Sequence, residues 1–410
     1  MLSQLINKTK LVVLILSLCS FGFPKDSFQL ILNNNDLNDA WWFSKNRKGV
    51  AESHFLIKIN RNQIYNKLNY NFEFRLGNET MSFSNSYIEI LINSNNSIRI
   101  GEFYRLHSTY LNDDISSGSL LISNNAQALR KIGFNGKITS KNYKNLSFDY
   151  GISHGFLDKT DLYIEAPYLH EKFIYSNLNL NDSLFSFGLV HTAIWAGHVQ
   201  GFGKQPSTFE DYFRIFRASH GSDNALKTDQ INALGNHLGV WDFVFQKNLF
   251  NEKNVKVYYQ HLFEDDSGFR FKNKYDGLWG IEFSKRNLSF LLEYIDTTDQ
   301  SVNGDFTKEA DSYYNHGVYQ HGWSFQGNSL GNPFISFEEN IPVRILHFGL
   351  SKNTKILKYK ILLSKNLNIS NEVYYGFFFE RKLRKINYGF SIANNLDNND
   401  YLQFSLGYQL

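Results

Sequence analysis

Apolar and polar side chains alternate along most of this chain with a period of two residues. In residues 401–410 (YLQFSLGYQL), apolar side chains occupy every second position from Leu402 to Leu410, with Gln, Ser and Gly between them. The same alternation is clear in residues 68–76, 288–294, 373–379 and 386–392. A period of two is typical of β-strands with one apolar and one polar face. The sequence therefore predicts a protein built mainly from β-strands.

Polar connectors rich in Asn, Lys, Ser and Gly separate the predicted strands and differ in length. Short connectors are expected near residues 61–66, 93–96, 140–145, 179–183, 247–254, 284–287, 351–355 and 381–385. Longer connectors are expected near residues 105–129, 155–168, 196–237, 264–277 and 296–342. If each strand crosses a membrane once, every long connector lies on the side opposite the short ones, as in outer-membrane barrels. We therefore predict an all-β fold, a closed antiparallel transmembrane β-barrel of the outer membrane with about 18 strands.

The alternation also assigns each side chain of a strand to one face of the barrel wall. In a transmembrane barrel the apolar face is turned to lipid and the polar face lines the lumen. We expect six apolar side chains to face lipid: Phe72, Phe74, Phe290, Leu292, Phe404 and Leu406. Three polar side chains are expected in the lumen: Glu73, Gln403 and Gln409. A polar lumen of this size holds water unless loops fold into it.

The N-terminus has the features of an export signal. Two lysines precede an apolar run over residues 11–18, and small residues follow it. This pattern predicts a signal peptide at residues 1–22, followed by one barrel domain at residues 23–410 in the outer membrane. Cys19 is the only cysteine, but the bulky Leu18 before it argues against lipid attachment. Cleavage after the signal would leave a mature chain without thiol chemistry.

Composition agrees with a barrel and excludes one class of partner. Aromatic residues make up 16% of the chain and only 5 residues are Pro, which favours paired strands and aromatic girdles. The net charge is +3, from 42 basic and 39 acidic residues, and no basic run follows a phosphate backbone. We therefore expect no nucleic-acid partner.

The two longest external loops contain the residue types that bind sugars. Aromatic rings stack on sugar faces, Asn and Gln match pairs of hydroxyl groups, and Arg binds uronic acids bidentately. The candidate polysaccharide-binding residues are Arg214, Arg217, Tyr319, Trp323, Gln326 and Asn328. The alternative is that the loop aromatics pack on one another and restrict the mouth of the barrel. A short helix is expected near residues 208–218, with Ser207 as its N-cap and Glu210 reaching back.

Other chemical motifs in the loops carry less weight, and we expect no catalytic residue, cofactor or metal. His316 and His321 are five residues apart, a spacing that suits neither a helix face nor a strand face. His220 and Ser222 have the spacing of the His-x-Ser pair of outer-membrane phospholipase, without the rest of that pattern. The acidic clusters at residues 113–114 and 264–266 are expected to be solvated loop acids.

Four stretches of the chain resemble a known family. They are residues 116–134 (SSGSLLISNNAQALRKIGF), 166–175 (APYLHEKFIY), 232–239 (NALGNHLG) and 315–333 (NHGVYQHGWSFQGNSLGNP). These segments resemble the capsule assembly proteins of the Wzi family. The resemblance implies an outer-membrane barrel of about 18 strands that acts as a non-enzymatic lectin for capsular polysaccharide or exopolysaccharide, in contact with outer-membrane lipids.

One part of the family pattern is not found in this sequence. Family members include a periplasmic helical bundle. The segment at residues 24–40 is short and Asn-rich and lacks sustained helical periodicity, so the sequence has no room for such a bundle there. A periplasmic export partner therefore stays uncertain. Two alternatives to the lectin also stay open: a general or substrate-selective porin and, more remotely, an outer-membrane lipid hydrolase.

Overall fold

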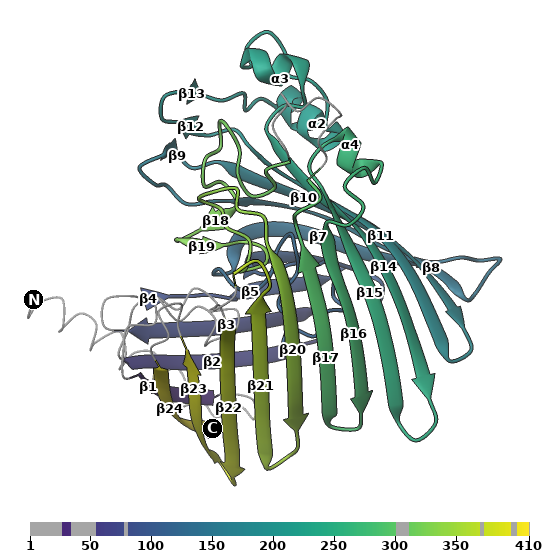
Figure 1. The fold of residues 1–410 in the computed structure, drawn as a ribbon, viewed down its shortest axis with the longest axis vertical. Helices are drawn as coiled ribbons and strands as arrows, with labels where there is room; N and C mark the ends of the chain where they lie inside the picture. The colour runs from purple at the N-terminus through teal and green to yellow at the C-terminus, as the bar shows by residue number, and fades with distance from the viewer. Residues whose placement is uncertain are drawn as a thin grey trace, which may run out of the picture.

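The chain forms a closed antiparallel β-barrel of 18 strands (Figure 1). The computed structural model describes residues 27–33, 55–77, 81–300, 311–369, 373–394 and 400–409. The predicted signal peptide lies outside these residues. The first strand pairs with both the second and the last, which closes the barrel. The barrel strands are β1 (Ser27–Asn33), β2 (Phe55–Tyr65), β3 (Leu68–Gly77), β5 (Tyr87–Leu91), β6 (Asn96–Phe103), β7 (Leu129–Thr139), β8 (Leu146–Phe156), β10 (Tyr168–Leu180), β11 (Ser183–Trp195), β14 (Asn236–Leu249), β15 (Lys253–Phe263), β16 (Gly277–Lys285), β17 (Leu288–Asp296), β20 (Arg344–Asn353), β21 (Leu357–Asn366), β22 (Val373–Leu383), β23 (Ile386–Asn394) and β24 (Asp400–Gln409).

Shorter elements lie in the connections between barrel strands. They are β4 (Met81–Ser82), β9 (Tyr163–Glu165), β12 (His198–Val199), β13 (Gly203–Lys204), α2 (Phe209–Arg217), α3 (Lys227–Ile231), α4 (Asp266–Phe269), β18 (Ser324–Phe325) and β19 (Asn328–Ser329). No helix in the described part of the chain has the length and apolar character that a membrane-spanning helix needs.

The loop pattern predicted from the sequence is confirmed. The connections β6–β7, β8–β10, β11–β14, β15–β16 and β17–β20 are long and lie at one end of the barrel, while tight turns join strands at the other end (Figure 1). One short connector was predicted too early, because β2 continues through Tyr65 and the turn is made at Asn66, whose φ of 54° is left-handed. Asn tolerates that conformation better than most residues, and this explains its place in the turn.

The outward faces of the strands carry exposed apolar side chains, as alternation predicted. Phe290, Leu292, Phe404 and Leu406 are all exposed on the outer wall. Phe74 is the exception, since it is 1% exposed and its ring lies 5.3 Å from that of Phe83, which packs over β3. The neighbouring Phe72 is half-buried under the same ring, so neither of these two side chains presents its full surface to lipid.

The predicted luminal positions are polar and, where buried, paired. Glu73 is buried and forms ion pairs with Arg75 and with Lys58, at 3.0 Å for the lysine. Gln409 accepts a hydrogen bond from Lys382 of β22. Burying a charged group is costly unless it is paired. The ion pairs of Glu73 therefore allow this charged side chain to be buried in the wall of the lumen.

The predicted helix near 208–218 is confirmed as α2, but its cap was misplaced by one residue. Thr208, not Ser207, is the N-cap, and its hydroxyl accepts a hydrogen bond from the Asp211 N–H at 3.2 Å. The Asp211 carboxylate accepts in return from the Thr208 N–H at 2.9 Å, so Asp211 performs the role expected of Glu210. Glu210 is instead paired with Arg214 one turn later.

Candidate functional site

The long β6–β7 connection folds into the barrel and crosses its lumen. We call residues 104–128 the plug. The Ser117 N–H donates to the Glu293 carboxylate of β17 at 2.6 Å, and the Ile115 carbonyl lies 2.7 Å from the His347 ring of β20. Asn112 donates to Glu282 of β16 at 2.7 Å. The polar side chains of the lumen therefore hold a segment of the chain itself.

Asp242 of β14 accepts several hydrogen bonds at once, from the plug and from neighbouring strands. Its carboxylate, fully buried, accepts hydrogen bonds from the hydroxyl groups of Ser108 at 2.8 Å and Tyr110 at 2.7 Å, both in the plug. The Gln260 amide of β15 donates to it at 2.8 Å, and Tyr175 of β10 also donates. A buried carboxylate with this many donors fixes the plug against three different strands.

A second loop, residues 311–337, packs on the plug from the external side, and we call it the cover loop. Trp323 donates from its indole nitrogen to the Leu121 carbonyl at 2.9 Å, and Asn332 donates to the Gly118 carbonyl at 3.0 Å. The hydroxyl of Tyr314 donates to the Leu120 carbonyl. Together with the plug and inward residues of the barrel strands, this loop forms the largest apolar core in the described part of the chain. The aromatic loops thus pack on one another and on the plug.

This packing decides how two of the sequence-predicted sugar-binding residues are placed. Trp323 is 0% exposed and Tyr319 is 1% exposed, with the Tyr319 hydroxyl donating to the Ala196 carbonyl at 3.2 Å. Neither ring offers a face to an external ligand in this structure. The faces of these two rings, which the sequence suggested for stacking on sugars, are covered by other residues of the protein. This favours the loop-packing alternative for both side chains.

Gln326 and Asn328 belong to a different part of the cover loop, the hairpin of β18 and β19. Gln326 and Gly327 form its two-residue turn with φ values of 49° and 70°, the conformation that suits a tight hairpin. The Gln326 N–H donates to the Asp158 carboxylate at 3.0 Å, while the Gln326 side chain is exposed. Burial raises the pKa of the Asp158 carboxyl, and the hydrogen bond from Gln326 opposes that rise.

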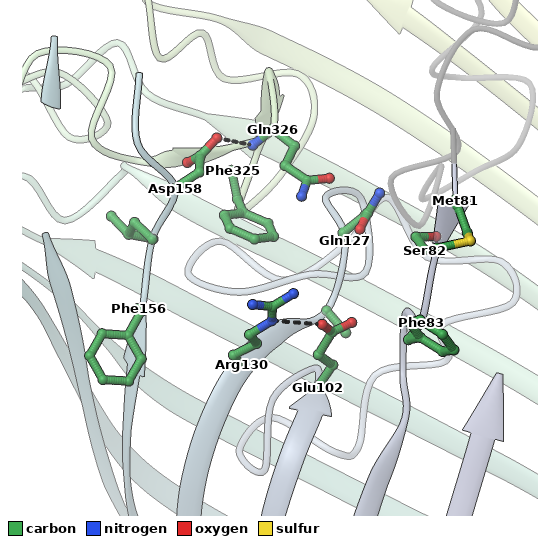
Figure 2. A pocket seen from close by; sticks show the side chains of 12 residues that line it. Met81, Ser82, Phe83, Glu102, Gln127, Arg130, Phe156, Asp158, Phe325 and Gln326 are labelled. Carbon is green, nitrogen blue, oxygen red and sulfur yellow. Dashed lines mark hydrogen bonds and ion pairs between the residues drawn. The ribbon is translucent and has the colours of Figure 1, made fainter. Parts of the chain in front are cut away.

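The hairpin overhangs a cleft of about 360 Å³ at the external rim of β6, β7 and β8 (Figure 2). Its walls combine aromatic rings, amides and one ion pair. The lining residues are Met81, Ser82, Phe83, Glu102, Gln127, Ala128, Arg130, Phe156, Leu157, Asp158, Phe325 and Gln326. In Figure 2 the side chains of Arg130 and Glu102 lie below the Gln326 hairpin, with Phe156 on one side and Phe83 on the other.

Arg130 is the most accessible charged group of the cleft. Its Nε atom donates to Glu102 at 3.0 Å, yet its side chain is 81% exposed. An exposed pair of this kind contributes no more than about 1 kcal/mol to stability, so the guanidinium can turn to an arriving anion at small cost. Phe156 is 49% exposed beside it and offers a ring face. Sequence reasoning missed both residues, because each stands alone at the end of a different strand and only pairing brings them together.

Arg214 and Arg217 lie on α2 rather than at the cleft. Arg214 pairs with Glu210 at 2.7 Å and donates to the His220 carbonyl at 3.2 Å. Arg217 is exposed, and among the described residues no hydrogen bond or ion pair involves its side chain. Among the described residues no hydrogen bond or ion pair joins these arginines to the hairpin of Gln326, so the predicted set divides into three groups.

A family model for capsule assembly protein Wzi matches residues 44–359. The chain belongs to the Wzi family. Among solved structures, the outer-membrane Wzi of Escherichia coli matches with a TM-score of 0.64 and 13% identity, over 94% of this chain and 85% of that one. That protein is described as a carbohydrate-binding β-barrel involved in group 1 capsule assembly. No curated protein sequence matches the chain.

Porin structures also match this Wzi-family chain, with much lower TM-scores. A refined porin structure matches with a TM-score of 0.36 and 10% identity, over 94% of this chain and 99% of that one. An engineered Rhodopseudomonas blastica porin matches with a TM-score of 0.36 and 8% identity, over 94% and 98%. These likenesses carry no functional argument. The family and the closed barrel indicate an outer-membrane protein.

The geometry offers no support for acyl transfer by this Wzi-family chain. Ser222 donates its hydroxyl to the Asn224 side chain at 2.6 Å, and the His220 ring lies 3.0 Å from the Asn232 carbonyl. No hydrogen bond joins His220 to Ser222 among the described residues. A general base must reach the hydroxyl that it activates, and the two side chains are engaged elsewhere.

The remaining polar motifs have structural roles in the loops. Partial burial of His316 lowers its pKa to about 4, and its neutral ring accepts from the Tyr319 N–H at 3.1 Å. Asp113 pairs with Arg105, and Asp265 caps α4 by accepting from the Gly268 N–H. Within the described ranges, no three His, Cys, Asp or Glu side chains gather as metal ligands would.

Proposed function

We propose that this chain binds capsular polysaccharide or exopolysaccharide at the cell surface and retains it there as a lectin, without catalysis. The observation that carries the proposal is the contrast between the two ends of the cover loop. Its core residues pack on the plug inside the barrel, while its hairpin lines a cleft at the external rim. A barrel closed in this way suits capture of a polymer at the surface better than passage of solutes.

The cleft offers the three kinds of contact that a sugar needs. The exposed ring of Phe156 provides a stacking face, the Gln326 amide faces hydroxyl pairs, and Arg130 can bind a uronate carboxylate bidentately. Covering roughly 100 Å² of apolar surface by one sugar would contribute about 2–3 kcal/mol. One such contact is weak, but many barrels that bind repeats of one polymer chain multiply it.

The test compares a double variant of the cleft with a control variant of an arginine at the opposite end of the barrel. In Arg130→Ala combined with Phe156→Ala, surface polysaccharide should fall and the polymer should accumulate in the medium, with synthesis unchanged. Arg286→Ala is the matched control, since Arg286 is also exposed and paired with a carboxylate at 2.9 Å, but in a tight turn at the opposite end of the barrel. Both variants should reach wild-type abundance in the outer membrane.

Deleting the whole protein sets the reference for this experiment. If deletion releases the polysaccharide while the double variant retains all of it, the cleft is not the binding site. If deletion leaves the surface polymer unchanged, the lectin proposal itself is wrong.

A further inference from the structure

Helix α2 packs against the outside of the barrel wall. The ring of Tyr212 lies 5.4 Å from that of His170 on β10 and 5.8 Å from that of His154 on β8, in edge contacts. His170 points away from the lumen, because the next residue, Glu171, points into it and accepts from Lys131 at 2.9 Å. The β11–β14 connection therefore folds outward over the rim, whereas the plug folds inward.

The position of α2 is directly above the apolar band of the outer wall. Lys172 lies two residues below His170 on the same face and donates to the Phe216 carbonyl at the end of the helix. Ile174, the next outward residue of β10, is exposed, as is Phe187 on β11. These side chains begin the surface that faces lipid, so the helix lies where the membrane meets water.

Three phenylalanines of α2 are exposed, although the ring of Phe216 also lies 5.7 Å from that of His170 on the wall. Phe209, Phe213 and Phe216 are 77%, 43% and 39% exposed, and their spacing of four and three residues places them along one side of the helix. The rings of Phe209 and Phe213 are 4.9 Å apart. A short helix with an apolar stripe and charged neighbours is the pattern of a helix that lies in a membrane interface.

Basic side chains accompany the stripe at the C-terminal end of α2. The Lys172 ammonium lies 4.3 Å from the centre of the Phe216 ring, and Arg217 extends from the last turn with no partner in the described residues. Arg214 is one turn earlier and shares its charge with Glu210. Cations beside a membrane surface are complementary to the phosphate groups of anionic lipids.

A second external helix continues this arrangement around the rim. Trp241 of β14 points outward and donates from its indole nitrogen to the Phe269 carbonyl of α4 at 3.1 Å. The two rings are 4.9 Å apart, and Phe269 remains exposed. Trp241 also stacks on Phe187, at 5.1 Å, so α4 is continuous with the lipid-facing aromatic surface.

We propose that α2 is an interfacial helix that inserts its phenylalanine stripe into the outer leaflet and binds the phosphate of an anionic lipid through Arg217 and Lys172. Continuity with the lipid-facing band and the complementary charge both select this occupant over a sugar. The proposal goes beyond polysaccharide binding and gives Arg217 a different ligand from the one that the sequence suggested.

Insertion is tested by a fluorophore attached to a single cysteine in barrels reconstituted with brominated phosphatidylcholine. Phe213→Cys should be quenched nearly as strongly as Phe187→Cys, a lipid-facing reference. Gln326→Cys, exposed on the cover-loop hairpin, should not be quenched. Removal of Cys19 with the predicted signal would make each label unique. If the label at position 213 is quenched no more than the label at position 326, the helix does not enter the membrane and the proposal fails.

The phosphate contact is tested in nanodiscs of phosphatidylcholine mixed with phosphatidylglycerol, by native mass spectrometry of the lipids retained. Arg217→Gln should weaken the preference for the anionic lipid about fivefold, as expected for one cation near a membrane surface. Lys204→Gln is the control, an exposed external lysine paired loosely with Glu165 at 3.7 Å. If Arg217→Gln releases surface polysaccharide and keeps the lipid preference, the arginine serves the sugar and the lipid proposal is wrong.

Discussion

Single side chains obey the two-residue period wherever the barrel wall has nothing packed over it. Phe404 and Leu406 on β24 are exposed on the outside as alternation requires, while Phe74 on β3 is buried because Phe83 folds over it. The period predicts the face of a residue but not what else covers that face. In the loops, residue type likewise does not show what covers a side chain. The sequence therefore could not distinguish the buried rings of Trp323 and Tyr319 from rings that bind a ligand.

Neighbouring residues on β24 should respond oppositely to the same substitution. Phe404→Arg places a cation on a surface that faces the lipid core, at a cost of about 2–4 kcal/mol. Gln403→Arg points to the other side of the wall, where polar groups line the strand. We expect the first variant to lower the fraction of heat-modifiable folded barrel and the second to leave it near wild type. Equal losses from the two variants would contradict the assignment of faces.

The elements were predicted well where local chemistry determines them. The strands follow from alternation, and α2 follows from a cap and an acidic first turn. The capping pair is Thr208 and Asp211, each one residue after the expected Ser207 and Glu210. Where the long loops pack could not be predicted from the sequence. Their positions depend on contacts between distant segments, such as Trp323 with Leu121 or Ser108 with Asp242. The cleft at Arg130 was missed for the same reason.

The contact between the β15–β16 loop and the cover loop should depend on pH. Glu264 accepts from the N–H groups of Ser312 and Tyr313, each at 2.8 Å, and burial raises the pKa of its carboxyl to about 7 from an ordinary value of 4.5, with Asp311 and Asp265 adding to the rise. The folded loop therefore binds this proton more tightly than the unfolded loop. The stability that it contributes is greatest below about pH 4.5 and is lost as the pH rises toward 7.

Hydrogen exchange at the amides of Ser312 and Tyr313 measures this effect. Their protection should decrease between acidic and neutral pH, after correction for the intrinsic exchange rate. Glu264→Gln should reduce that decrease, and Asp276, whose pKa burial raises to about 6, should account for what remains. Glu338→Gln, an exposed carboxylate of the β17–β20 connection that also contains Ser312 and Tyr313, is the control. A pH profile unchanged by Glu264→Gln would exclude Glu264 as the responsive group.

At the scale of the whole molecule, the plug is the feature that distinguishes a surface-binding barrel from a porin. A barrel of this strand number can enclose an aqueous channel when its interior is empty. Here the plug spans the lumen, and the carboxylates of Asp242 and Glu293 are committed to it. The same polar residues that would line a channel are therefore what holds it shut.

Planar-bilayer recording of purified protein tests this closure directly. The wild-type barrel should show no stable conductance, since the plug crosses the lumen and the cover loop packs on the plug. Asp242→Asn keeps the size of the side chain but leaves one carbonyl oxygen for donors from Ser108, Tyr110, Tyr175 and Gln260, so we expect transient openings. Replacing residues 109–122 by a short Gly-Ser linker should give a steady open channel, provided that the variant remains heat-modifiable. Steady conductance by the wild-type protein would instead make the porin the better interpretation, and the polar wall of the lumen would then be its pathway.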